Sequence, residues 1–136
     1  MVQHSAEVKE AILRCYEVFS AGDVEASMRL LTQEGFASGI GTDPEEWADT
    51  RTEFMALLKG WMTEPRVVVR LEAREDPRCL EEGSVGWVVD RPTFVLAGGG
   101  SVSSRMTAVM RQEEGEWKLV HAHWSVGVPN EEAFVS

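Results

Sequence analysis

The chain has 136 residues, the size of one ordinary domain, and its 43% hydrophobic and 26% charged residues are globular proportions. A formal net charge of -10, from 23 acidic and 13 basic residues, argues against nucleic acid and anionic membrane surfaces as partners. No apolar stretch approaches the roughly 20 residues that cross a bilayer, and the N-terminus has no secretory signal pattern. We therefore expect a soluble, cytoplasmic protein.

Two short helices are predicted at the start of the chain. The first follows Ser5, where apolar residues recur at helical spacing: Val8, Ile12, Cys15 and Phe19. Gly22 suits the left-handed position that ends a helix, and Asp23 can cap the next one. Residues 36–42 are expected to form a short strand or an extended loop, because small and polar residues interrupt them.

A third, longer helix is predicted from Asp43. Asp43 suits the N-cap, Pro44 the first helical position and Glu46 the far end of a capping box. The helix is expected to end before Pro65, because proline disfavours helix in its predecessor. The residues expected to face the core are Trp47, Phe54, Leu57, Leu58 and Trp61.

The rest of the chain alternates between apolar and polar residues, which is typical of half-buried strands. Four strands are predicted: residues 66–74, residues 84–96, a strand that follows the turn at 97–101 and ends near 112, and residues 117–126. A bend is expected at Arg91-Pro92, and hairpin turns are expected at 97–101 and 113–116. Helices first and antiparallel strands afterwards indicate an α+β fold with the helices on one sheet face. We expect one domain over 1–136, with its core at about 5–127 and a solvated tail at 128–136.

Three motifs resemble a known family. These motifs are Ala21-Gly22-Asp23, Gly41-Thr42-Asp43-Pro44, and residues 117–125, which read Trp-Lys-Leu-Val-His-Ala-His-Trp-Ser after a Glu-Gly turn. From about residue 12 to 125 the chain resembles the SnoaL-like branch of the nuclear-transport-factor-like superfamily, which includes polyketide cyclases, ketosteroid isomerase and a kinase association domain. The resemblance implies a cone-shaped α+β barrel: a curved antiparallel sheet around a long helix, with two further N-terminal helices and a cavity at the wide end. It does not select an activity, because members include enzymes, ligand binders and oligomerisation modules.

The resemblance implies two candidate catalytic residues. Isomerases of this superfamily use a carboxylate to remove a proton beside a carbonyl, and donors that stabilise the enolate. Asp43 precedes a proline as their base does, although an N-cap role already explains it completely and is the favoured interpretation. Tyr16 lies where the isomerase has a stabilising tyrosine, although it can also be a core residue with its hydroxyl at the rim. The second donor acid has no equivalent, because Met106 or Ala108 occupies its region.

Aromatic residues predict the character of the pocket. Several tryptophans can converge on the cavity, although each can also simply fill the core. Arg91 can direct a guanidinium toward a carboxylate ligand, or a bulge beside Pro92 can send Asp90 and Arg91 to solvent. The expected pocket residues are Phe36, Trp47, Trp61, Trp87, Arg91, Met106 and Trp124. We expect a small, apolar, flat ligand.

The last strand predicts a homodimer interface. Its alternation directs Val120, Ala122, Trp124 and Val126 to the core. The residues between them therefore face outward, and this mixture of apolar and basic side chains is typical of an interface. With the neighbouring strand, this outward set is Arg105, Thr107, Trp117, Leu119, His121 and His123. A bulge in this strand would invert the assignment. His121 and His123 have no third ligand at a recognisable spacing, so we expect no metal and no cofactor.

The sequence thus favours a pocket protein for an apolar, cyclic or aromatic molecule. One alternative is a cofactor-independent isomerase, cyclase or hydratase that uses an aspartate as acid and base. Another is a homodimerisation module, whose cavity would be filled by its own side chains.

Overall fold

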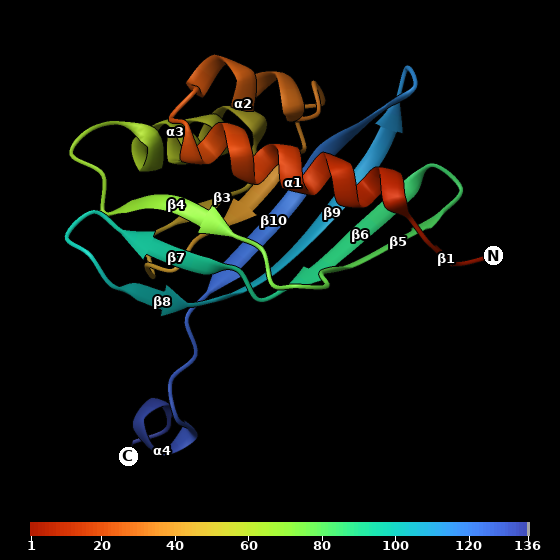
Figure 1. The fold of residues 1–136 in the computed structure, drawn as a ribbon. Helices are drawn as coiled ribbons and strands as arrows, with labels where there is room; N and C mark the ends of the chain where they lie inside the picture. The colour runs from red at the N-terminus through yellow and green to blue at the C-terminus, as the bar shows by residue number, and fades with distance from the viewer. Residues whose placement is uncertain (136) are drawn as a thin grey trace.

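The computed structural model describes residues 1–135, so Ser136, the last residue of the expected tail, lies outside the described residues. Three helices cover one side of a strongly curved sheet, and a fourth, short helix stands away from the body (Figure 1). The helices are α1 (Ala6–Ser20), α2 (Val24–Leu30), α3 (Arg51–Met62) and α4 (Asn130–Ala133). None of the helices in this part of the chain has the length and hydropathy of a membrane-spanning segment.

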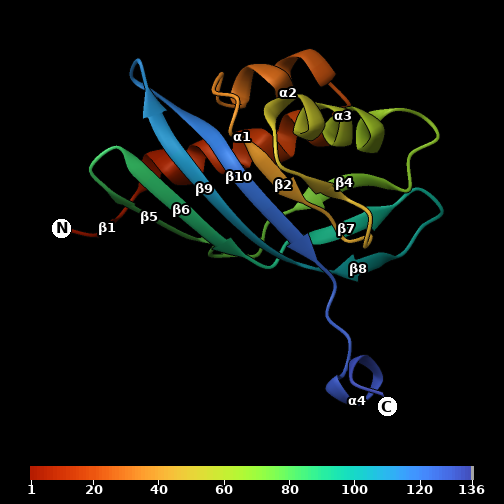
Figure 2. The same ribbon diagram turned by 180° about the vertical axis from the view of Figure 1, so that it is seen from behind.

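The strands form two sheets. The larger has the order β1-β5-β6-β9-β10-β2-β3, and the smaller has the order β4-β7-β8. All pairs are antiparallel except β10 and β2, which lie side by side in parallel (Figure 2). The strands are β1 (Gln3–His4), β2 (Ser38–Ile40), β3 (Trp47–Ala48), β4 (Val68–Glu72), β5 (Arg78–Glu82), β6 (Val85–Asp90), β7 (Thr93–Leu96), β8 (Ser101–Ser103), β9 (Arg105–Glu113) and β10 (Glu116–Ser125). The predicted α+β class and curved sheet are confirmed, with one parallel pair added.

The first helix begins and ends where the sequence predicts, and the second begins where predicted. The Ser5 side chain accepts a hydrogen bond from the Val8 backbone N–H at 3.0 Å, which caps α1. Gly22 has φ 71°, and the Asp23 side chain accepts from the Ala26 N–H at 3.0 Å, which caps α2. The expected short strand between residues 36 and 42 is β2.

The predicted start of the third helix at Asp43 is wrong. The Asp43 carboxylate accepts from the Glu45 N–H at 2.9 Å, and the Glu46 carboxylate accepts from the Asp43 N–H at 2.8 Å. These capping-box contacts close an exposed turn instead, because the same side-chain acceptors stabilise turns as well as helix ends. The chain then forms β3, and α3 begins after Thr50, whose side chain accepts from the Glu53 N–H. The predicted end before Pro65 is confirmed.

Three features differ from the predictions. Residues 78–82 form β5, which lies outside the predicted strands. Residues 84–96 divide at Pro92, where the chain leaves the larger sheet and enters the smaller one. The tail contains the short helix α4. The bend at Arg91-Pro92 and both hairpin turns occur where expected.

The core lies between the helices and the concave face of the larger sheet. Phe54 on α3 is fully buried and packs directly on Gly39 of β2, where an added Cβ would lie 2.6 Å from the Phe54 ring. A side chain larger than hydrogen at residue 39 would therefore push α3 off the sheet. Val8, Ile12 and Tyr16 on α1 fill the rest of this space together with strand residues that include Val88, Met106, Met110 and Ala122.

Replacing Thr50 with alanine should lower the free energy of unfolding by about 0.5 to 2 kcal/mol, because it removes the side-chain acceptor that caps α3. Asp43→Ala changes only an exposed turn and should cost less than about 0.5 kcal/mol. Chemical denaturation followed by circular dichroism measures both values. A larger loss for Asp43→Ala than for Thr50→Ala would contradict this assignment of the helix start.

Candidate functional site

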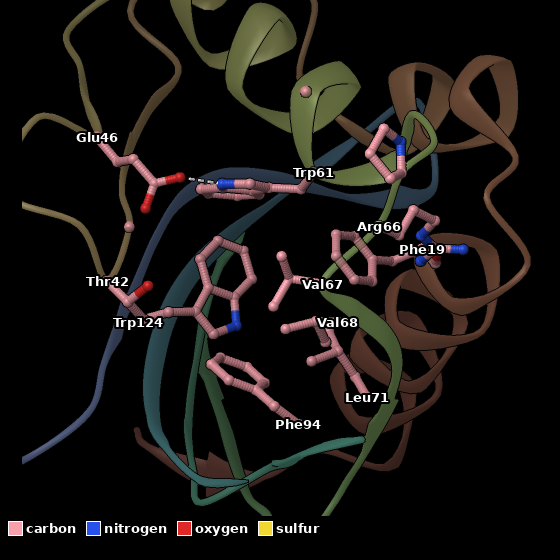
Figure 3. Close-up of a pocket in the computed structure, with 13 residues that line it drawn as sticks. Phe19, Thr42, Glu46, Trp61, Arg66, Val67, Val68, Leu71, Phe94 and Trp124 are labelled. Carbon is pink, nitrogen blue, oxygen red and sulfur yellow. Dashed lines mark hydrogen bonds between the residues drawn. The ribbon is translucent and has the colours of Figure 1, made fainter. Parts of the chain in front are cut away.

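A cavity of about 330 Å³ lies between the C-terminal ends of α1 and α3, the smaller sheet and the end of β10 (Figure 3). Four aromatic side chains and three aliphatic ones dominate its wall: Phe19, Trp61, Phe94, Trp124, Val67, Val68 and Leu71. A second void of about 30 Å³ borders it, shares Phe19, Leu71 and Trp124 as wall, and reaches Tyr16. The site is therefore mainly apolar and is large enough for a small cyclic molecule.

Two indoles form one side of the cavity. Trp61 comes from the last turn of α3 and Trp124 from the end of β10, and their rings meet edge to face with centroids 5.4 Å apart. Such pairs are favourable because the positive edge of one ring meets the negative face of the other. Neither ring is fully buried, so each retains surface that faces the cavity.

The loop at residues 41–46 closes the cavity beside Trp61. The Glu46 carboxylate accepts a hydrogen bond from the Trp61 indole N–H (Figure 3). It accepts another from the Asp43 backbone N–H. Gly41 allows this close approach, because an added Cβ there would lie 2.7 Å from both Glu46 and Trp61. Glu46 thus fixes the orientation of one aromatic wall.

Arg66 is the cation in the wall. Its two terminal nitrogens donate to the backbone oxygens of Phe19 at 2.9 Å and Ser20 at 3.1 Å, at the C-terminus of α1. The guanidinium also lies over the Phe19 ring, 5.5 Å from its centroid. A cation at this position is stabilised by the negative end of the helix dipole and by the ring face.

A buried hydrogen bond joins α1 to the end of β6. The Tyr16 hydroxyl donates to Asp90 at 2.9 Å, and the Arg74 Nε lies 3.4 Å from the other Asp90 oxygen. Asp90 is only 2% exposed, so its charge is paired rather than solvated. Burial and then the negative charge of Asp90 raise the pKa of Tyr16 far above its usual value. The phenol is therefore neutral, and its hydroxyl donates its hydrogen bond to Asp90 rather than to a ligand.

The structure brings few of the expected pocket residues together. Trp61 and Trp124 line the cavity, and Met106 is buried in the core on the concave face. Phe36 is 54% exposed and lies under Arg111 instead. Arg91 is exposed, because the bend at Pro92 turns it outward while Asp90 turns inward.

Two other tryptophans and the candidate base lie outside the cavity. Trp47 is 61% exposed, because it belongs to the edge strand β3 and not to a helix. Trp87 lies on the convex sheet face, since its neighbours Gly86 and Val88 point to the core. Asp43 is exposed in the loop that closes the cavity, but it does not line the cavity.

Sequence reasoning missed most of the wall. Phe94 was hidden inside one long predicted strand, although Pro92 indicated the change of direction before it. Val68 and Leu71 share a wall because β4 has an irregularity between Val68 and Arg70, which no residue type indicates. Phe19 was on the predicted helical stripe, where it could not be told from a core residue.

The convex face also differs from the expectation. Trp117 and Leu119 are 8% and 6% exposed and lie in the core, so their outward assignment is wrong. The cause is a register shift at residue 120 of β10, between Leu119 and His121, which moves the two halves of the strand out of phase. His121, His123, Arg105 and Thr107 do lie on the convex side, where the His121 ring is 2.8 Å from the Ser38 hydroxyl. Burial and the nearby His123 lower the pKa of His121.

The match to a family model identifies the family. Residues 8–129 match the family model of the SnoaL-like domain, and the chain belongs to that family. No curated protein sequence matches this chain significantly.

Solved structures share the fold. An NTF2-like protein of unknown function from Pseudomonas putida has a TM-score of 0.80 at 13% identity, with 98% of this chain and 96% of that chain covered. A provisionally assigned dehydratase of the NTF2-like family from Streptomyces avermitilis has a TM-score of 0.74 at 21% identity, covering 90% and 95%. A provisionally assigned ketosteroid isomerase from Parabacteroides distasonis has a TM-score of 0.72 at 16% identity, covering 90% and 89%. At these identities the likeness concerns the fold alone.

Tyr16→Phe should lower the free energy of unfolding by about 1 to 3 kcal/mol, because it leaves the buried Asp90 carboxylate without its hydroxyl donor. Urea denaturation measures the change, with Glu10→Gln on the exposed side of the same helix as the control. The control should differ from wild type by less than about 0.5 kcal/mol. If Tyr16→Phe is as stable as the control, the hydrogen bond does not hold α1 to β6.

Proposed function

We propose that the protein binds a small, apolar, cyclic or aromatic molecule in the cavity beside Trp61 and Trp124. The observation that carries the proposal is the wall itself: four aromatic rings around about 330 Å³, with the two charged wall residues engaged by the protein. Flat apolar molecules fit such a surface because they bury apolar area against the rings and leave no polar group without a hydrogen-bond partner.

Binding without chemical change is favoured over isomerase activity. Asp43 lies outside the cavity, and the Tyr16 hydroxyl donates its hydrogen bond to Asp90. Glu46 is the carboxylate in the wall, and hydrogen bonds from two N–H groups occupy it. The dehydratase and isomerase names of two structural neighbours keep a catalytic role as the alternative, which turnover of a bound carbonyl compound would establish.

The cytoplasm is the proposed compartment. Cys15 and Cys79 are free thiols, which suits a reducing environment. Burial raises the pKa of Cys15 to about 12. Burial is also the largest cause that raises the pKa of Cys79, to about 11. Neither thiol is therefore a nucleophile at neutral pH.

Val68→Trp should block the cavity, because Val68 lines it and an indole would occupy the space of a ligand. The dissociation constant for 1-anilinonaphthalene-8-sulfonate, measured from its fluorescence, should rise at least about tenfold. Val128→Trp is the matched control, since Val128 is 58% exposed and lies outside both the cavity wall and the convex sheet face. Equal dye binding by wild type and both variants would contradict the proposed site.

We further propose that the convex sheet face forms a homodimer. Val85, Val89 and Val109 are 43%, 40% and 37% exposed there, beside the half-buried Trp87. Sheet faces that remain in water are usually polar, so this apolar group fits a self-complementary interface. Thr107 and the half-buried His121 extend it on β9 and β10.

The double change Thr107→Glu and Val109→Glu should convert a dimer to a monomer, because it places two carboxylates in the apolar group. Light scattering after size exclusion gives the mass. Leu13→Glu with Thr52→Glu, on exposed helical positions, is the control and should remain dimeric. A monomeric wild type would refute the interface.

A further inference from the structure

We infer that the C-terminal tail of one copy of this chain docks on a group of arginines on the convex sheet face of a second copy. The tail is residues 126–135, and the arginine group is Arg78, Arg91 and Arg105. The inference rests on the proposed homodimer, because it names a contact that holds the two copies together at one end of that face.

The register of the larger sheet brings the three arginines together. Asp90 lies opposite Met106, and the residues two positions further along β6 and two positions back along β9 are joined by a backbone hydrogen bond of 3.1 Å. Arg91 therefore lies opposite Arg105, between these two pairs. Arg78 is exposed on β5, the other neighbour of β6. The residues before and after each of the three arginines are buried, so all three side chains point to the convex side.

No anionic group of the described chain neutralises these arginines. The ion pairs within residues 1–135 use other cations. Arg105 donates only to the neutral Ser125 hydroxyl, at 3.2 Å. Like charges directly opposite each other destabilise a sheet, although the chain has 23 acidic residues from which a partner could come. Carboxylates from outside the chain would remove this repulsion and form charge-assisted hydrogen bonds.

The tail carries the chemistry that the arginine group lacks. Glu131 and Glu132 belong to α4 and are exposed, and Phe134 and Val135 are 80% and 76% exposed. Figures 1 and 2 both show α4 away from the body of its own chain. Its carboxylates and its apolar side chains are therefore both available to a second copy. The carboxylates match the arginines, and the apolar side chains match Val89, which is exposed on β6 opposite Arg78.

The tail leaves the sheet beside the arginine group. A Cβ added at Gly127 would lie 3.5 Å from the Arg105 guanidinium carbon. Glu132 follows Gly127 by five residues, which span up to about 17 Å when extended. Sheets that pack face to face lie about 10 Å apart. The tail is therefore long enough to cross from its own sheet to the arginines of a facing copy.

Two-fold symmetry makes the exchange reciprocal. If the ends of the two convex faces that carry Arg105 meet, the arginine groups of both copies gather in one region and repel each other. Each tail then supplies two carboxylates to the three arginines of the other copy. Exchange of a terminal segment between identical chains is a low-cost route to a dimer, because every contact is made twice.

Sedimentation velocity on the full chain gives the dissociation constant of the dimer. Arg91→Glu with Arg105→Glu should raise this constant at least about tenfold, because it reverses the receiving charges. Glu131→Arg with Glu132→Arg should raise it by a similar factor, although this change makes the acidic chain less negative and would strengthen nonspecific association. The four changes together restore opposite charges and should return the constant to within about threefold of wild type.

Arg29→Glu with Lys59→Glu is the matched control, because it makes the same change in net charge at exposed helical positions. It should leave the dissociation constant within about threefold of wild type. Cross-linking tests whether the tail binds a second copy. In an equal mixture of Glu132→Cys chains and Arg91→Cys chains, mild oxidation should join one chain of each kind, which mass spectrometry identifies.

An intramolecular disulfide in a chain that carries both Glu132→Cys and Arg91→Cys, without mixed dimers, overturns the inference, because the tail then lies on its own sheet. A wild-type dimer that Glu131→Arg with Glu132→Arg does not weaken also overturns the inference and leaves the proposed homodimer intact. A monomeric wild type overturns the inference and the proposed homodimer together.

Discussion

The hydrogen bond between Tyr16 and Asp90 holds the place where the molecule divides into two sheets. Asp90 is the last residue of β6 in the larger sheet, and Thr93 begins β7 in the smaller one. A buried carboxylate is tolerated there only because a hydroxyl and a guanidinium supply its partners. With α1 tied to this point, the two sheets meet at an angle, and the cavity occupies the space between β4, β7 and the end of β10.

Two register shifts decide which side chains face inward. In β10 the shift at residue 120 lets Trp117 and Leu119 enter the core and still leaves Trp124 at the cavity. In β4 the shift at residue 69 brings Val68 to the same wall as Leu71. With regular alternation, Trp124 would lie on the opposite face of β10 from Trp117 and Leu119, and Val68 on the opposite face of β4 from Leu71. The apolar wall therefore depends on two local interruptions of the strand pattern.

The sequence was informative where one residue type has one structural use. Gly22 and Pro92 predicted a helix end and a strand break, because their backbone restrictions allow little else. Asp43 misled, because an aspartate before proline suits a turn as well as a helix cap. The family was readable from the motif of the last strand, and Trp61 and Trp124 were expected at the cavity, whereas the rest of its wall was not.

The complete wall could not be predicted because it is assembled from segments far apart in the chain. Phe19, Trp61, Phe94 and Trp124 belong to four different elements, and each looks like an ordinary core residue in its own segment. Glu46 and Arg66 gave no local sign of their roles, because a tertiary contact defines each of them. Pattern analysis identifies elements, and a site between elements requires their arrangement.

The position of β10 has a consequence for how the protein is made. The last long strand inserts between β9 and β2, so the early strands β2 and β3 join the larger sheet only through it. A ribosome releases these early strands well before their neighbour is synthesised, and they wait with an unpaired edge. Trp124, near the end of β10, then completes the aromatic wall. The cavity is thus one of the last parts of the molecule to form, and a chain that has not yet reached β10 lacks its complete wall.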